Sequence, residues 1–169
     1  TMQYISHKRG SPEYVEPMAP ADQYTLRLTA GPELSMINIP KNQLLDRCFT
    51  ITRASNKMGL RLDSELKPEF QQTKMISSIV VPGTLQWPVG GNPILLLPNC
   101  QTTGGYPRIG VVVDADMWKL AYIGAGDRIK FKWVTRDEAL YLRKYQLGQF
   151  IQAWNQTFKQ PLRHHLLLY

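Results

Sequence analysis

The feature that most constrains the fold of this chain is a series of short apolar stretches separated by turns rich in glycine and proline. Residues 24–30, YTLRLTA, alternate apolar and polar side chains, which is typical of a strand with one buried and one solvated face. Comparable stretches occur at 48–53, 59–62, 75–81, 84–87, 95–97, 108–113 and 128–134. Turns join them, rather than helical crossovers, which favours antiparallel pairing over a parallel α/β sheet. The pattern predicts a mainly β fold, a closed and mostly antiparallel β-barrel with peripheral helices.

Three segments carry helix signals. Pro40 could start a short helix over 40–45, and Asp114 is a good N-cap residue for a second short helix. Thr135 and Glu138 form a capping box, which predicts a third helix that continues to about residue 158. One side of this helix is apolar and contains Leu140, Leu147, Ile151, Trp154 and Phe158. We expect this side to lie on the barrel, and docking to a partner is the alternative.

These elements divide the chain into three parts. Residues 1–23 contain three prolines and no hydrophobic periodicity, so we expect an arm or linker. Residues 24–134 form the predicted barrel, and residues 135–169 form the C-terminal helix and tail. A length of 169 residues suits one domain and is sufficient to bury a core without disulfides or metals.

The composition argues against several classes of partner. The net charge is +7 and the isoelectric point is about 9.5, which would suit nucleic acid, an anionic membrane or an acidic protein. The basic residues are scattered, however, and those at 128–132 alternate with apolar residues as on the solvated face of a strand. No apolar run approaches the ~18 residues of a membrane helix. We therefore expect a cytoplasmic protein with no nucleic-acid partner and no membrane partner.

Metal-ion and nucleophile chemistry have little support in the sequence. Cys48 and Cys100 could pair, but their spacing does not require it, and we expect reduced thiols with a structural role. Only His7, His164 and His165 could join them in a metal site, and no zinc-type spacing is present. No nucleophile elbow, phosphate-binding loop or dinucleotide fingerprint occurs. We expect no metal site in this chain.

The segment 95–113, LLLPNCQTTGGYPRIGVVV, places a polar loop between two apolar strands. Four side chains of this loop can hydrogen-bond a carboxylate, an amide or a ureido group: Gln101, Thr102, Thr103 and Tyr106. Gly104 and Gly105 allow a ligand to approach the backbone closely and expose its N–H groups. The alternative is a wide turn whose polar side chains satisfy its own backbone. Local reasoning leaves both interpretations open.

Three stretches resemble a known protein family. They are SNKMGLRL at 55–62, PGTLQWPVGGNPILLLPNCQTTGGYPRIGVVVDADMWKLA at 82–121 and GAGDRIKF at 124–131. Together they resemble the biotin-dependent carboxyltransferase family, subdomains C and D. That family includes allophanate hydrolase subunit 2, the C subunit of 5-oxoprolinase and the carboxyltransferase region of urea carboxylase. The resemblance covers residues from about 25 to 134 and implies a cyclophilin-like β-barrel, equivalent to the C-terminal half of a full-length family member.

The resemblance also implies a function. It suggests the C-terminal domain of one component in an ATP-dependent amidohydrolase complex that acts on a cyclic amide or ureido C–N bond. The implied partner is a homologous protein of the type of allophanate hydrolase subunit 1 or the B subunit of 5-oxoprolinase. ATP would be bound elsewhere in the complex, with no cofactor in this chain, and the chain would be inactive alone. The alternative is a non-catalytic regulatory or interaction module, as in histidine-kinase-inhibitor systems.

The resemblance extends the candidate site beyond the loop. The loop would lie at the rim of the barrel, where Asn56, Arg61 and Gln86 are expected to face it. Arg61 could instead be a structural ion-pair residue. The family usually carries an acidic residue at the position of Asn99, arginine at that of Lys57 and glutamine at that of Tyr122. The candidate substrate-binding residues are Asn56, Arg61, Gln86, Asn99, Gln101, Thr102, Thr103, Gly104, Gly105 and Tyr106; no catalytic residue is identified.

Overall fold

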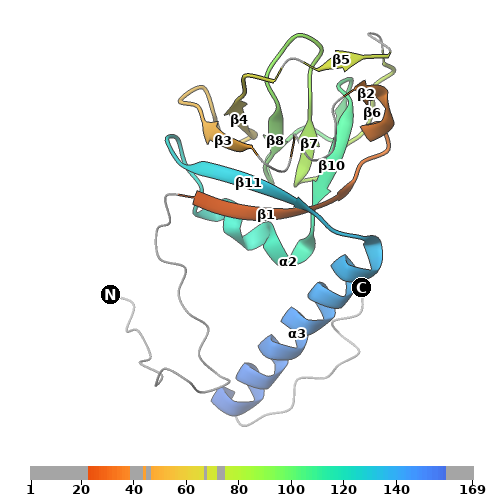
Figure 1. Ribbon diagram of the computed structural model, residues 1–169. Helices are drawn as coiled ribbons and strands as arrows, with labels where there is room; N and C mark the ends of the chain where they lie inside the picture. The colour runs from red at the N-terminus through yellow and green to blue at the C-terminus, as the bar shows by residue number, and fades with distance from the viewer. Residues whose placement is uncertain (1–22, 39–43, 45–46, 67, 72–74, 159–169) are drawn as a thin grey trace.

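The computed structural model describes residues 23–38, 44, 47–66, 68–71 and 75–158. Within these residues, the main strands close into a barrel in the order β1-β10-β7-β8-β4-β3-β11 (Figure 1). Their bounds are β1 Gln23–Ala30, β3 Cys48–Ile51, β4 Gly59–Asp63, β7 Thr84–Gln86, β8 Ile94–Leu96, β10 Arg108–Val112 and β11 Arg128–Trp133. β1 and β11 pair in parallel, and the other neighbouring pairs are antiparallel. The predicted mainly β fold, a closed and mostly antiparallel barrel, is confirmed.

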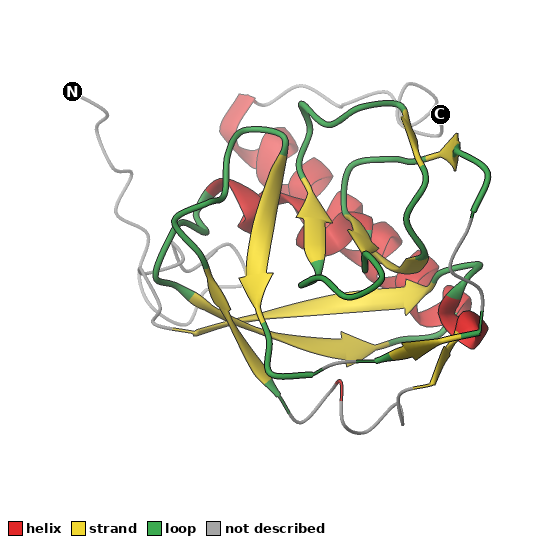
Figure 2. Ribbon diagram, turned by 90° about the horizontal axis from the view of Figure 1, so that it is seen from above, coloured by secondary structure: helices red, strands yellow, loops and turns green. Residues whose placement is uncertain are grey.

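Short sheets and helices complete the described part of the chain. β2 (Ile37–Asn38) pairs with β5 (Glu69–Phe70), and β6 (Ser78–Ile79) pairs with β9 (Thr103–Gly104). The helical segments are η1 Leu34–Met36, α2 Asp114–Met117, η2 Trp118–Ala121 and α3 Arg136–Phe158. Viewed from above, the strands lie in front of the long helix (Figure 2), so the helices α2 and α3 occupy one side of the barrel.

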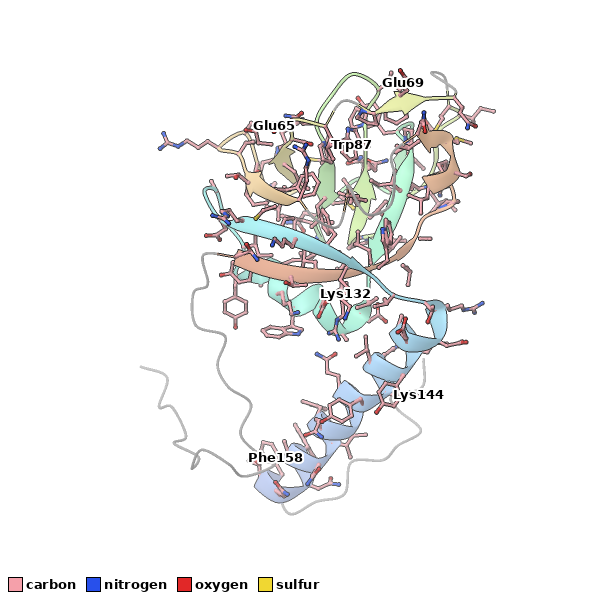
Figure 3. All side chains as sticks on the ribbon, viewed as in Figure 1. Glu65, Glu69, Trp87, Lys132, Lys144 and Phe158 are labelled. Atoms are coloured by element: carbon pink, nitrogen blue, oxygen red, sulfur yellow. The ribbon has the colours of Figure 1, made fainter. Side chains whose placement is uncertain are left out.

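The inward side chains of the strands fill the barrel. Leu26 and Leu28 on β1 are completely buried. The ring of Phe49 has its centroid 6.4 Å from that of Trp87 and 5.4 Å from that of Phe131. Trp87 lies among the strands in Figure 3. Because side chains alternate along a strand, the neighbours of these core residues face outward and are available to build a surface site.

Most predicted strands are confirmed with somewhat different bounds. The prediction of a strand over 75–81 was too long, because only Ser78–Ile79 has strand structure. Its partner, Thr103–Gly104, lies within a segment predicted as a loop. Pairs this short show no periodicity in the sequence. The helix predicted at 40–45 falls mainly outside the described residues, as does the arm predicted at 1–23.

The predicted N-cap at Asp114 was wrong by one position. Helix α2 begins at Asp114, and Val113 occupies the N-cap position with extended backbone and no side-chain cap. The Asp114 carboxylate instead lies 3.2 Å from the guanidinium of Arg143 on α3. Gln146 of α3 also donates to the backbone oxygen of Ala115 at 3.3 Å. These contacts attach α3 to α2.

Helix α3 is one continuous helix and begins with the predicted capping box. The Glu138 N–H donates to Thr135 Oγ1 at 3.2 Å, and the Thr135 N–H donates to Glu138 Oε2 at 2.6 Å. This backbone bond, with a second from the Thr135 hydroxyl, lowers the pKa of Glu138. The capping box is therefore confirmed.

The prediction that the apolar side of α3 lies on the barrel was wrong for most of the helix. The helix leads away from the barrel, and Phe158 lies at its distant end (Figure 3). Only Ile151 of the predicted side is buried, and Phe158 is 55% exposed. The rings of Phe150, Trp154 and Phe158 pack against one another instead. Periodicity identifies an apolar side of a helix but does not show what covers it.

Candidate functional site

Three residues around the candidate site lie directly opposite one another on three adjacent barrel strands. Arg61 on β4 pairs with Ile94 on β8, and Ile94 pairs with Gln86 on β7. Residues directly opposite one another in a sheet point to the same face. Their chain neighbours belong to the barrel core: Leu60, Leu62, Leu85, Trp87 and Leu95. Arg61, Ile94 and Gln86 therefore form a row on the outer face of the barrel.

The polar loop that contains β9 covers one end of this row. Val80 donates its N–H to Thr102 O at 3.0 Å, next to the β6–β9 pair, and Trp87 donates to Pro107 O at 3.0 Å. These bonds hold the loop against the barrel wall, and Gln86 beneath it is only 1% exposed. The prediction that the polar loop lies at the barrel rim was wrong. The loop lies across the outer face of β7 instead.

A pocket of about 170 Å³ lies between the loop and the row. Its lining comes from the turn before β4, from β4, β7 and β8, and from both ends of the loop: Asn56, Met58, Gly59, Arg61, Gln86, Ile94, Leu96, Gln101 and Tyr106. A wider hollow of about 650 Å³ continues beside it and shares Arg61, Ile94 and Tyr106. The structure therefore brings five of the candidate polar residues to one pocket.

The other candidates lie outside this lining. Asn99 is exposed in the turn after β8. Thr103 and Gly104 form β9, and the backbone oxygen of Thr102 continues the same pairing. Gly105 is exposed, and its φ is outside the positive range that favours glycine. The whole loop was predicted to line the concavity, but only Gln101 and Tyr106 of the loop line the pocket. Ligand binding by any of these residues stays a prediction.

The polar groups of the pocket differ in how firmly they are held. Asn56 accepts the Met58 N–H at 2.9 Å through Oδ1, which fixes the turn before β4. Gln86 donates from Nε2 to the backbone oxygen of Tyr106 at 3.4 Å. Arg61 is exposed, and among the described residues it has no ion pair, so the structure gives no support to a structural ion-pair role.

One residue that sequence reasoning missed holds the elements around the pocket together. Arg108 lies opposite Gln86 in the β10–β7 register. Its guanidinium donates to both carboxylate oxygens of Glu33, at 2.8 and 2.6 Å, and to the backbone oxygen of Ile79 at 2.7 Å. The bonds from Arg108 lower the pKa of the Glu33 carboxylate. Arginine directly after the loop motif was the only sequence signal for this role.

The lining of the pocket offers several groups that can hydrogen-bond a polar ligand. Its lining, within the described part of the chain, contains amides, a phenol and a guanidinium, but no carboxylate, imidazole or thiol. Carboxylate, imidazole and thiol groups often act as general bases or nucleophiles, as do amines, phenols and hydroxyls, and the phenol of Tyr106 is present here. Cys48 and Cys100 are both free and lie elsewhere. No group of three or more potential metal ligands occurs among the described residues.

No helix found in the described residues has the length and apolar character needed to cross a membrane.

Comparisons with known proteins match this barrel. The family model described as the carboxyltransferase domain, subdomain A and B, matches residues 3–133. The C subunit of 5-oxoprolinase from Escherichia coli is 36% identical over 131 residues, which cover 76% of this chain and 42% of that protein. The Haemophilus influenzae protein of the same name is 40% identical over 96 residues, covering 57% of this chain and 31% of that protein. The chain therefore spans less than half the length of these relatives.

A solved structure shows the same fold. The urea carboxylase of Kluyveromyces lactis superposes with a TM-score of 0.68 at 20% identity, covering 79% of this chain and 13% of that one. The matching family model describes subdomains A and B, where the resemblance suggested C and D, while the carboxyltransferase family is the same. Because the family model matches well over half of the residues, this chain belongs to the carboxyltransferase-domain family.

Proposed function

We propose that this barrel is part of one component of a cytoplasmic, ATP-dependent amidohydrolase complex of the 5-oxoprolinase or allophanate hydrolase type. Its pocket would bind a small cyclic amide or ureido acid. The observation that carries the proposal is the convergence of neutral amides and one guanidinium, which has no ion pair within the described residues, on a pocket of about 170 Å³. Pockets for drug-sized ligands are usually about 300–1,000 Å³. The pocket itself suits a smaller metabolite, and the adjoining hollow of about 650 Å³ offers a way in from solvent.

The chemistry of the lining fits such a substrate. The amides of Asn56, Gln86 and Gln101 can pair with the N–H and C=O groups of a lactam or ureido group. Arg61 can bind a carboxylate through charge-assisted hydrogen bonds. The side chains of Ile94 and Leu96 supply an apolar surface for the carbon skeleton of the substrate.

Other chains would supply the remaining parts of the reaction. The two 5-oxoprolinase relatives are more than twice the matched length, and their description as one subunit of an enzyme implies further subunits. We propose that a homologous partner protein contributes the proton-transfer groups and that ATP is bound outside this chain. This chain would then be a binding component, inactive alone.

The test is reconstitution of the full-length protein with its partner proteins. We expect ATP-dependent opening of 5-oxoproline or hydrolysis of allophanate. Arg61→Ala should lower kcat/KM by about 10- to 100-fold, because a hydrogen-bonded charge is removed. Arg53→Ala is the matched control, since Arg53 is also exposed but does not line the pocket. Absence of turnover for both substrates in the assembled complex would contradict the proposal.

One observation favours a second candidate, a non-catalytic interaction module. Helix α3 exposes aromatic side chains at Phe150, Trp154 and Phe158, and exposed aromatic clusters are typical of protein interfaces. Under this alternative the chain would bind the homologous partner protein without any turnover. Trp154→Ala would then weaken the complex in size-exclusion chromatography, whereas Arg61→Ala would not.

A further inference from the structure

Two segments that are distant in the sequence form one small unit on the outer face of β7. We call this unit the lid and define it as residues 75–80 and 101–106. Strands β6 and β9 pair within it, and Val80 donates its N–H to Thr102 O at 3.0 Å. A two-stranded pair this short is not stable in isolation, so the lid depends on the barrel for its structure.

The lid covers the buried end of the pocket. A Cβ atom at Gly104 would lie only 2.7 Å from Gln86 Nε2, so the lid rests directly on this side chain, which is 1% exposed. Gln101 and Tyr106 belong to the lid and line the pocket. The pocket is therefore complete only while the lid lies on the barrel.

The lid adjoins two firmly anchored points. Val81, directly after the first segment, accepts a hydrogen bond from Thr84 Oγ1 at 2.7 Å. Pro107, directly after the second segment, accepts the N–H of Trp87 at 3.0 Å. These two points are positions about which the lid can turn without disturbing the strands of the barrel.

Between these points the lid is held by few contacts. Within the described residues, two hydrogen bonds join it to the barrel. Gln86 Nε2 donates to Tyr106 O at 3.4 Å, which is longer than the usual range of about 2.7–3.2 Å. Arg108 Nη1 donates to Ile79 O at 2.7 Å. The bond from Arg108 is therefore the stronger of the two attachments.

Glu33 fixes Arg108 in the position that makes this bond. The Glu33 carboxylate accepts hydrogen bonds from Arg108 Nε at 2.8 Å, from Nη2 at 2.6 Å and from the backbone N–H at 3.0 Å. Paired hydrogen bonds between a guanidinium and a carboxylate define the orientation of both groups. The guanidinium is thus held on the barrel while its remaining nitrogen, Nη1, reaches the lid.

One feature of the closed lid favours its opening. The hydroxyl oxygen of Ser78 is buried and has no hydrogen-bond partner among the described residues. A buried hydroxyl without a partner costs free energy, which is recovered when the group returns to water. Val80 is the only buried residue of the lid, so little apolar burial opposes this opening.

We propose that the lid opens and closes on a barrel that stays folded, and that the bond from Arg108 to Ile79 O holds it closed. Opening uncovers Gln86 and removes Gln101 and Tyr106 from the pocket, so closure assembles the binding site. A ligand that contacts the lid then shifts the population toward the closed state. The inference goes beyond the proposed function and holds whatever the pocket binds.

The first experiment follows amide hydrogen exchange of the full chain at low urea concentrations. The Val80 N–H should exchange at least about tenfold faster than the Leu62 N–H, which bonds Pro93 O at 2.9 Å within the barrel. Exchange of Val80 should depend little on urea, because opening exposes little surface, whereas exchange of Leu62 should accelerate steeply. Equal rates with the same urea dependence would overturn the proposal.

The second experiment tests the bond that holds the lid. Lysine in Arg108→Lys keeps the charge opposite Glu33 but lacks the fork of donors that bonds Glu33 and Ile79 together. Exchange of Val80 should become at least about tenfold faster. Arg143→Lys is the matched control, because Arg143 pairs with Asp114 away from the lid. No change in Arg108→Lys, or the same change in both variants, would exclude Arg108 as the holding residue.

The third experiment changes the lid in the opposite direction and serves also if Arg108→Lys does not fold. Ser78→Ala removes the unpartnered hydroxyl, so the closed state is favoured and exchange of Val80 should become at least about fivefold slower. Ser77→Ala is the matched control within the lid, since Ser77 is exposed. Exchange in Ser78→Ala that is as fast as in Ser77→Ala would contradict an opening that returns Ser78 to water.

Discussion

Asp116 is a buried carboxylate that two basic side chains hold in place. Its side chain is completely inaccessible, yet it is ionised between two cations. Arg27 donates from Nε and from its backbone N–H to Oδ2, at 2.9 and 2.8 Å, and Lys119 Nζ lies 2.8 Å from Oδ1. Burial alone would raise the pKa of Asp116, but the bonds from Arg27 and Lys119 outweigh it and lower the pKa. This cluster joins β1 to α2.

The pKa shift of Asp116 predicts an acid-sensitive contribution to stability. A carboxylate whose pKa is lower in the folded state stabilises the fold above its unfolded pKa of about 3.9. That contribution is lost as pH falls through the lower, folded pKa. Asp116→Asn should cost about 3 kcal/mol at pH 7, because it leaves two cations without their counter-ion. The difference from the unmodified chain in urea unfolding should shrink below about pH 4.

The matched control for Asp116→Asn is Asp137→Asn. Asp137 is exposed in the first turn of α3 and away from the cluster. Its replacement should change the free energy of unfolding by less than about 0.5 kcal/mol at any pH. A difference for Asp116→Asn that stays constant down to pH 2 would contradict the role assigned to its ionised form.

The site residues show how far sequence can predict geometry. Gln101 and Tyr106 were expected beside Asn56, Arg61 and Gln86, and the structure brings these five to one pocket. Residue chemistry and family resemblance were sufficient for that expectation. The position of the pocket on the outer face of the barrel could not be predicted. The loop that buries Gln86 follows a path that depends on the pairing of β6 with β9, which are far apart in the sequence.

At the level of secondary-structure elements, helix α3 depends on its capping box more than on packing. Ile151 is its only fully buried residue, so little tertiary contact supports the helix. Thr135→Ala removes the hydroxyl that caps Glu138 and should cost about 1 kcal/mol of local stability. Hydrogen exchange should become faster for the amides of α3 but not for those of the barrel.

The control for Thr135→Ala lies on the same helix. The Thr157 hydroxyl only donates to Ala153 O within the last turns. Thr157→Ala should leave exchange in the first turns of α3 unchanged, because alanine has the higher helix propensity. Faster exchange throughout the barrel in Thr135→Ala would show that α3 and the barrel unfold together, contrary to this prediction.

The elements differ in how well the sequence predicted them, for physical reasons. Strand β1 alternates over its whole length because one face meets the core and the other meets water. β6 and β9 have two residues each and exist only because they meet one another. The apolar side of α3 was visible in the sequence, but its contacts were not, since periodicity contains no information about neighbours.

On the scale of the whole molecule, the barrel is closed by its most distant strands. β1 pairs with β11 in parallel over six residue pairs, from Gln23 opposite Arg128 to Leu28 opposite Trp133. β11 also pairs with β3, so its removal would open the barrel on both sides. Ile129 and Phe131 of β11 are buried and belong to the main core. We therefore expect the pairing of β11 and the packing of its core residues to form, and to be lost, together as the barrel closes or opens.

This arrangement predicts opposite results for two C-terminal truncations that differ by only a few residues. A chain that ends at residue 134 lacks α3 but keeps β11, and it should retain a cooperative urea transition with a modest loss of stability. A chain that ends at residue 127 also lacks β11, which exposes the edges of β1 and β3 and removes Ile129 and Phe131 from the core. We expect no cooperative transition in that chain and no dispersed amide NMR spectrum. A folded 1–127 chain would show that the β1–β11 pairing is dispensable, and an unfolded 1–134 chain would show that α3 is part of the barrel's stability and not peripheral to it.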